Sequence, residues 1–317
     1  MVSSYNTKVV YSIDYDSLVS AVSEYETYSI DDKIDYPFKS LGYGVELLAS
    51  CNGLVCVRSY NCSLGKQYFC LWNPATREYK EIPKLPFGFD NGSVGLFGLG
   101  YGHKIDDYKL VIGVEARGSK DIKLLYIYTL ASNSWKIKKM IPLWNTNDIR
   151  QNSGVVVNGD LHWLVLGQND ISLWSLDVND ENFKEMQLPK ELLVEVKDRF
   201  LVLGLLKGCL CILVGAYVND VHVHSELWEM LDYESQEFWT RRYIITNESI
   251  FRDQRFLTMI WSFEDGKILF TSAGFVILYD PEHGSSITLN IFDFFCNLKY
   301  FGSLMPLKSG TYVPGKG

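Results

Sequence analysis

The chain has 317 residues, of which 47% are hydrophobic and 21% charged, and its formal net charge is −8. This composition is typical of a globular protein with a full apolar core. The negative charge argues against a nucleic-acid partner, because such proteins usually present a basic field. No apolar run approaches the ~18 residues of a membrane span, and residues 1–10 lack the apolar segment of a secretory signal.

The cysteines indicate the compartment in which the protein resides. There are seven, an odd number, and most stand among apolar residues, where a free thiol behaves as a small hydrophobic group. We therefore expect a soluble protein of a reducing compartment, cytoplasmic and/or nuclear, that binds neither nucleic acid nor membranes.

Strand patterns recur along the chain with a period of roughly 45 to 55 residues, which is typical of propellers and solenoids. Each repeat begins with a hairpin between apolar strands; in chain order these hairpins lie at 47–57, 97–112, 154–165, 203–212 and 259–270. Each repeat ends with an aliphatic-aromatic pair, a polar turn and usually a returning aromatic residue, at 71–80, 127–136, 173–184, 227–240 and 278–284. Asn-Gly between apolar runs, as at Asn52-Gly53, favours a tight type I′ turn.

Each repeat thus reads as four antiparallel strands, which is one blade of a propeller. Five such units fill about 45–290, and the ends, 8–14 and 300–307, carry strand patterns without a unit of their own. We predict that these ends pair as a composite blade. The fold class is therefore all-β, a propeller of about six four-stranded antiparallel blades closed by its N- and C-terminal strands. The single domain spans 8–307, and 308–317 is expected to be a flexible tail.

A propeller places its connections on two faces. The first and third connections of every blade share one side, here called the turn face, and the remaining connections share the other, the loop face. The loop-face connections are long and irregular, at 85–91, 142–150, 216–224 and 246–255. Loops on a rigid scaffold concentrate binding residues, and aromatic and Arg side chains anchor interfaces. The candidate partner-binding residues are Phe87, Phe89, Trp144, Arg150, Tyr217, His222, Phe251 and Arg252. The alternative for each is that its side chain folds back and caps the ring.

The sequence offers no catalytic motif. Gly98–Gly102 resembles a phosphate loop, but no helix follows it, so a close-packed strand is the better interpretation. Cys209 and Cys211 lack a second pair, which argues against zinc. His222 and His224 lack a third ligand, which favours a solvated hairpin.

The expected inner strands are also apolar, at 97–100, 155–157, 202–206 and 257–260. Acid–base hydrolysis needs two facing carboxylates, which these segments do not supply. We therefore predict that the protein is not an enzyme and has no catalytic residues, cofactor or metal.

Several ordered blocks resemble one known family, the plant F-box-associated (type 1) β-propeller domain. They are 50–56 with 71–83, 98–101 with 106–111, 126–135, 158–163, 176–189 and 226–239. The resemblance extends over about 8–307. The chain lacks the Gly-Gly doublets of kelch repeats and the Trp-Asp of WD40 blades.

In that family the propeller follows an F-box, a helical module that docks on Skp1 and so on a cullin ubiquitin ligase, while the propeller holds the substrate. The resemblance therefore implies a substrate receptor of an SCF-type E3 ligase, with target proteins on the loop face. The F-box pattern, expected upstream of Tyr11, is absent from this sequence. Skp1 and cullin are therefore expected as partners only if an F-box is supplied. The alternative is an F-box-less decoy or scaffold that binds the same kind of target without ubiquitination.

Overall fold

The structure is a computed structural model of the chain. It describes residues 2–4, 9–11, 33–61, 64, 66–86, 94–115, 123–139, 153–166, 171–193, 199–218, 221–233, 238–246, 257–272, 275–290, 296–297, 300, 302–303, 307 and 313–314. All further structural statements concern these residues.

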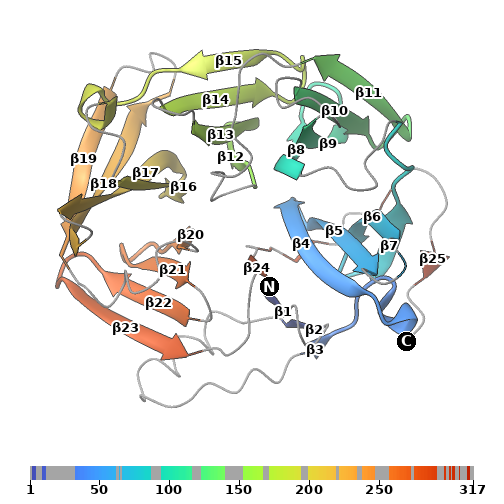
Figure 1. Ribbon diagram of the computed structural model, residues 1–317, viewed down its shortest axis with the longest axis horizontal. Coiled ribbons are helices and arrows are strands. Elements are labelled where there is room, and N and C mark those ends of the chain that lie inside the picture. The colour runs from blue at the N-terminus through green and yellow to red at the C-terminus, as the bar shows by residue number, and fades with distance from the viewer. Residues whose placement is uncertain are drawn as a thin grey trace.

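Five antiparallel sheets of consecutive strands stand around a ring (Figure 1). Blade 1 comprises β4 (Gly44–Cys51), β5 (Leu54–Asn61), β6 (Lys66–Asn73) and β7 (Glu78–Glu81). Blade 2 comprises β8 (Val94–Gly102), β9 (Asp107–Glu115), β10 (Lys123–Thr129) and β11 (Ser134–Lys139). Blade 3 comprises β12 (Val155–Val157), β13 (Asp160–Leu166), β14 (Ile171–Asp177) and β15 (Phe183–Met186).

Blade 4 comprises β16 (Arg199–Leu206), β17 (Cys209–Val218), β18 (Val221–Asp232) and β19 (Phe238–Ile245). Blade 5 comprises β20 (Thr258–Ser262), β21 (Ile268–Ser272), β22 (Phe275–Asp280) and β23 (Ser285–Asn290). Two short 3-10 helices accompany them, η1 (Lys39–Leu41) and η3 (Lys190–Leu193). Among the residues that the structure describes, no helix is long and apolar enough to cross a membrane.

The prediction of an all-β propeller with four-stranded antiparallel blades is confirmed, but the expected number of about six blades is wrong. The structure has five full blades. The terminal segments instead contribute two- and three-residue strands: β1 (Val2–Ser4), β2 (Val9–Tyr11), β3 (Lys33–Ile34) and β24 (Cys296–Asn297). Strands this short do not make a blade like the other five.

These short strands form a small sheet in the order β24-β1-β2-β3, between blade 5 and blade 1 (Figure 1). The predicted pairing of 8–14 with 300–307 is wrong for the described residues. Strand β2 pairs with its chain neighbours β1 and β3, and β1 pairs with β24 through Val2 opposite Asn297 and Ser3 opposite Cys296. Because β1 and β3 occupy both edges of β2, no edge of β2 is left for a strand from 300–307.

The expected tail, 308–317, contains one described element. Strand β25 (Val313–Pro314) pairs antiparallel with β7, so that blade 1 carries a fifth strand at its outer edge. The rest of the tail lies outside the described residues, and its flexibility stays a prediction.

The tight turns have the backbone that the sequence predicted. Asn52 and Gly53 both adopt positive φ, at 47° and 84°, as do Asn158 and Gly159, at 51° and 87°. A type I′ turn requires φ > 0 at both central residues, which Asn and Gly tolerate best. Lys207 and Gly208 adopt the same conformation without the Asn, at 50° and 85°.

The hydrophobic core is divided into layers between neighbouring sheets. Separate clusters fill the seams between blades 1 and 2, 2 and 3, 3 and 4, and 4 and 5, and one joins blade 1 to the small sheet. Trp72 on β6 and Trp163 on β13 are 2% and 3% exposed, so both indoles lie in the core. Each blade therefore depends on its neighbours to cover its apolar faces, because a sheet on its own leaves both of its faces exposed to water.

Returning aromatic residues of the repeat latch one blade to the previous one. The indole Nε1 of Trp135 on β11 donates to the carbonyl of Pro83, 2.7 Å away, just after blade 1. Trp239 on β19 likewise donates to the carbonyl of Gln187, 2.9 Å away, just after blade 3. The returning aromatic residue of the repeat thus joins neighbouring blades by a hydrogen bond at two seams.

Candidate functional site

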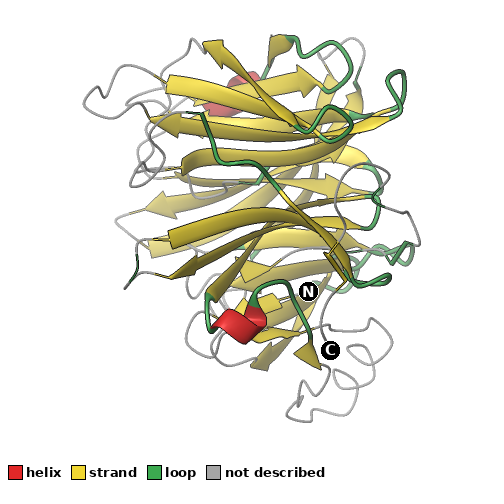
Figure 2. Ribbon diagram, turned by 90° about the vertical axis from the view of Figure 1, so that its right-hand side faces the viewer, coloured by secondary structure: helices red, strands yellow, loops and turns green. Residues whose placement is uncertain are grey.

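Viewed from the side, the strands run between two faces that carry the connections (Figure 2). The structure describes most turn-face connections, including 52–53, 103–106, 158–159 and 207–208. The loop-face connections fall largely outside the described residues. The polar contacts between described side chains therefore lie mainly on the turn face and in the seams between blades.

Six of the eight predicted partner-binding residues lie outside the described residues: Phe87, Phe89, Trp144, Arg150, Phe251 and Arg252. The other two are described in their backbone. Tyr217 and His222 stand opposite each other on β17 and β18, next to a register shift at Ala216. The expected long loop at 216–224 is therefore wrong, because these strands extend into a hairpin with only residues 219–220 between them. The alternative prediction of a hairpin at His222 and His224 is confirmed.

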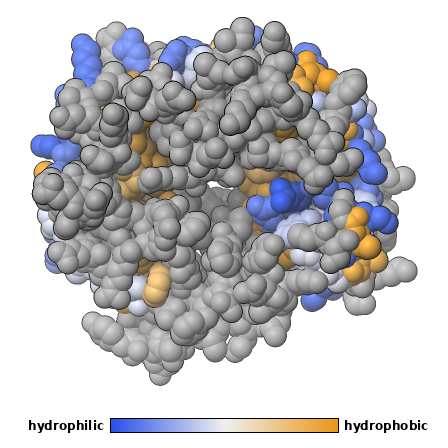
Figure 3. All heavy atoms as spheres, in the orientation of Figure 1, coloured by the Kyte–Doolittle hydropathy of each residue, from blue (hydrophilic) through white to orange (hydrophobic). Residues whose placement is uncertain are grey.

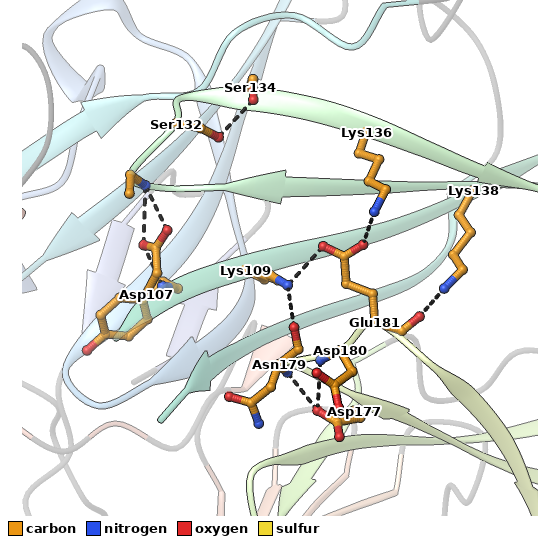
Figure 4. Close-up of polar contacts among 12 residues, drawn as sticks. Asp107, Lys109, Ser132, Ser134, Lys136, Lys138, Asp177, Asn179, Asp180 and Glu181 are labelled. Carbon is orange, nitrogen blue, oxygen red and sulfur yellow. Dashed lines mark hydrogen bonds and ion pairs between the residues drawn. The ribbon is translucent and has the colours of Figure 1, made fainter. Parts of the chain in front are cut away.

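Glu181 is the centre of a polar cluster at the seam of blades 2 and 3 (Figure 4). It belongs to the turn between β14 and β15. Its Oε1 lies 2.8 Å from Lys109 Nζ on β9, and its Oε2 lies 2.6 Å from Lys136 Nζ on β11. Lys138 Nζ donates to the Glu181 carbonyl, and Lys109 Nζ also donates to the Asn179 carbonyl at 3.1 Å. One turn of blade 3 is thus held by three lysines of blade 2.

The backbone of this turn presents Glu181 to the lysines. Glu181 adopts φ 59°, and its N–H donates to the Asp177 carbonyl at 2.8 Å. The Asp177 Oδ1 accepts the backbone N–H groups of Asn179 and Asp180, which fixes the first half of the turn. Burial acts to raise the pKa of Glu181, but the two ammonium groups outweigh it and hold that pKa below its ordinary value. The carboxylate is therefore charged at neutral pH.

A second set of polar contacts ties the turn at 130–133 in place. Asp107 at the start of β9 accepts the Ala131 N–H with both carboxylate oxygens, at 3.2 and 3.0 Å (Figure 4). The Leu130 carbonyl accepts from Lys80 Nζ on β7 at 3.2 Å, across the seam to blade 1. Burial lowers the pKa of Lys80, while the Asp107 carboxylate acts in the opposite direction. These contacts join the turn to β9 of its own blade and to β7 of blade 1.

The seam of blades 3 and 4 contains a chain of three polar side chains, of which His162 is fully buried and Asp160 and Tyr233 are partly buried. The Tyr233 hydroxyl lies 2.8 Å from His162 Nε2 and 2.9 Å from Asp160 Oδ2, and His162 Nδ1 lies 3.2 Å from the Val155 carbonyl. Burial lowers the pKa of His162 to about 4 and acts to raise that of Asp160. A hydroxyl carries one proton, so Tyr233 donates to only one of its two neighbours at a time.

No pattern in the sequence singles out these seam residues. The repeat placed polar residues in the turns, but the partners across each seam, such as Lys109 and Glu181, stand 72 positions apart (181 minus 109). No local signal joins them. Within the described residues, no group of three or more His, Cys, Asp or Glu side chains is arranged to hold a metal ion.

Apolar side chains also reach the surface. In the space-filling view of one face, hydrophobic residues gather beside the hollow at the centre of the ring (Figure 3). The most exposed large apolar residues are Leu64, Leu231, Leu41, Ile244, Ile105 and Ile137. Among the described residues they are spread over blades 1, 2 and 4 and over η1, so they do not by themselves define one docking patch.

Comparison with known proteins gives a match along most of the chain. A family model described as "F-box associated beta propeller domain" matches residues 1–294. The chain is 25% identical over 283 residues to "F-box protein At4g22390" of Arabidopsis thaliana, covering 81% of this chain and 67% of that protein. It is 25% identical over 321 residues to "F-box protein CPR1" of the same plant, covering 93% of this chain and 72% of that protein.

Solved structures are more distant. The chain matches a structure described as "Structure of Dos1 propeller" with a TM-score of 0.41 and 11% identity, over 84% of this chain and 60% of that one. A likeness at this level carries no argument about function.

Proposed function

Because the chain belongs to the family of F-box associated beta propeller domains, we propose that it is the substrate-recognition part of an SCF-type E3 ubiquitin ligase. The observation that carries the proposal is the family match over residues 1–294, which includes all five blades. The similar plant proteins are named F-box proteins, which supports a role in the same class of assembly. The propeller binds a target protein and performs no chemistry of its own.

We place the target on the loop face. The support is the chemistry of its long connections at 85–91, 142–150 and 246–255, which hold Trp, Phe and Arg residues, aromatic and cationic types that anchor interfaces. The turn face, by contrast, uses its polar groups to join neighbouring blades, as Lys109 and Glu181 do. When the connections on one face join the blades to each other, the long and irregular connections on the other face remain for binding a partner.

Affinity purification from tissue in which the proteasome is inhibited tests this proposal. Trp144→Ala, Phe89→Ala and Arg252→Ala should each weaken the recovered complex, by about 2 kcal/mol or more at a hot spot. Thermal unfolding should stay close to that of the unmodified chain. Lys104→Ala on the turn face, where the side chain is 72% exposed, is the matched control and should bind normally. Unchanged binding by all three loop-face variants would refute the assignment of the face.

Ubiquitination requires a second test. We propose that Skp1 and cullin join only through an F-box, so the chain should transfer ubiquitin to its target in a reconstituted SCF when an F-box is supplied at its N-terminus. Target binding without ubiquitination in that reconstitution would favour the alternative, a decoy or scaffold. We propose that both activities take place in the cytoplasm and/or nucleus, which fractionation of the native tissue would test.

We further propose that the small sheet closes the ring. The pairing of β1 with β24 brings together strands from opposite ends of the described chain, and Val10 on β2 is fully buried against blade 1. Val10→Asp should therefore loosen blades 1 and 5 first. Hydrogen exchange would test this: uniform loss of protection in all blades would contradict the proposed closure.

A further inference from the structure

Most of the described residues near the C-terminus contact blade 1, although they are more than 200 positions away from it. Tyr300 packs on the cluster between blade 1 and the small sheet, and Ser303 contacts the turns of blade 1. Leu307 enters the seam of blades 1 and 2, and β25 pairs with the outer strand β7. We call Tyr300, Gly302–Ser303, Leu307 and Val313–Pro314 the strap, and the surface of blade 1 that they occupy the track.

The deepest contact is made by Leu307. Its side chain is fully buried and belongs to the same cluster as Leu54 and Leu71 of blade 1 and Leu110 of blade 2. Burying a Leu side chain contributes about 1.5–3 kcal/mol. The seam therefore provides a specific apolar pocket for a residue that comes from neither blade.

Backbone recognition occurs over the two turns of blade 1. Asn73 is fully buried; its Oδ1 accepts the Ala75 N–H at 3.0 Å, and its Nδ2 donates to the Ser303 carbonyl at 3.0 Å. Beneath the strap, a Cβ added at Gly53 would overlap the Cβ of Ser303. The track thus binds the Ser303 carbonyl through one hydrogen bond from Asn73. It has room for Ser303 only because position 53 has no side chain.

The outer edge of blade 1 completes the track. Val313 stands opposite Tyr79 and Pro314 opposite Glu78, and β25 lies outside β7 at the rim of the ring (Figure 1). An extended peptide that adds a strand to a sheet edge, with a side-chain pocket for specificity, is a recurring mode of peptide recognition. Only two residues pair here, and Pro has no N–H to contribute, so this end is held weakly.

We propose that blade 1 carries a peptide-binding track, and that the strap occupies it as an exchangeable intramolecular ligand. The ligand chemistry is an extended segment with a small residue at the position of Ser303 and a large aliphatic residue four positions later, at Leu307. A partner segment with this chemistry gains the track by displacing the strap. This inference does not depend on the ligase assignment, because it concerns only this chain and its own C-terminal peptide.

Strap exchange can be measured directly. A protease recognition sequence is inserted between Asn297 and Tyr300, the folded protein is cleaved, and a fluorescein-labelled peptide of residues 300–317 is added. The labelled peptide should bind the cleaved protein and be displaced by unlabelled peptide. It should bind the uncleaved protein at least about 100-fold more weakly, because the tethered strap competes at high effective concentration. A Leu307→Asp peptide should bind at least about tenfold more weakly than the native peptide.

Glycine substitutions provide a matched pair in the full chain. Gly53→Ala and Gly208→Ala have the same positive φ, 84° and 85°, but nothing lies within 4 Å of an added Cβ at Gly208. Gly53→Ala should therefore displace the strap from the track in the uncleaved chain and expose it to protease, and Gly208→Ala should not.

Three results would overturn the proposal. They are a cleaved protein that keeps its circular dichroism but never takes up the labelled peptide, equal peptide binding with and without cleavage, and unfolding of the ring on cleavage. The last would identify the strap as a permanent part of the core. None of these results would bear on the ligase assignment, which is tested with the target protein.

Discussion

Trp163 offers the sharpest test of how the blades hold together. Its indole lies in the seam of blades 2 and 3, 3% exposed, and its Nε1 donates to the Phe97 carbonyl on β8 at 2.7 Å. The same carbonyl accepts the Gly154 N–H at 2.7 Å. A Cβ added at Gly154 would lie 2.7 Å from the indole atoms Nε1 and Cε2. Trp163 and Gly154 are therefore fitted to each other.

The magnitudes follow from these contacts. Trp163→Ala removes a buried aromatic side chain and should cost about 3–5 kcal/mol of unfolding free energy. Trp163→Phe keeps one ring and loses one hydrogen bond, while the Phe97 carbonyl retains its bond from Gly154; the expected cost is about 2 kcal/mol. Gly154→Ala forces an overlap with the indole and should cost about 1–3 kcal/mol.

Urea unfolding followed by circular dichroism measures all three and the double variant. Phe lacks the indole atoms that an added Cβ at Gly154 would meet, so Gly154→Ala with Trp163→Phe should be less destabilising than the sum of the single changes, by about 1 kcal/mol. Gly302→Ala is the control, since an added Cβ there meets no atom within 4 Å, and it should be additive with Trp163→Phe. Strict additivity of Gly154→Ala with Trp163→Phe would refute the proposed fit, as would a cost below about 1 kcal/mol for Trp163→Ala.

Three further predictions concern the polar side chains of the seams. Glu181→Gln leaves the nearly buried Lys109 ammonium without its carboxylate, 2.8 Å away, but with the Asn179 carbonyl still bound, and should cost about 2 kcal/mol at pH 7. Because the folded pKa of Glu181 lies below its ordinary value, its contribution is present at neutral pH and is lost as the pH falls below about 4.3; the variant should show a flatter acid limb, and an unchanged limb would contradict this. His162 is held neutral with a pKa of about 4, so the protein should lose up to about 1.4 kcal/mol per pH unit as the pH falls from about 6.5 towards that value. An NMR titration of the His162 ring that gives a pKa between 6 and 7 would refute its burial in the seam, and Tyr233→Phe, which removes a hydroxyl from two neighbours, should cost about 1–3 kcal/mol in urea unfolding.

The sequence was sufficient for the architecture of the blades because the signals that specify a blade are local. An Asn-Gly pair such as Asn52-Gly53 sets its turn by backbone sterics alone, and short apolar strands on either side of such turns recur in every blade. The number of blades was predicted wrongly for a related reason. The terminal strands have no repeat unit of their own, and the short β2 pairs with its nearest neighbours.

Other features were decided only by the tertiary structure. The long loop expected at 216–224 is a hairpin, because the strand pattern of β17 and β18 continues through polar residues that resemble a loop in the sequence. The partners of Glu181 and the contact of Leu307 with the first two blades join positions far apart in the chain. No periodicity within a repeat encodes such pairs, because it is the packing of one blade against the next that brings the two sides of a seam together. The sequence by itself therefore determined the strands and turns of each blade, and only the tertiary structure determined which residues of neighbouring elements contact each other.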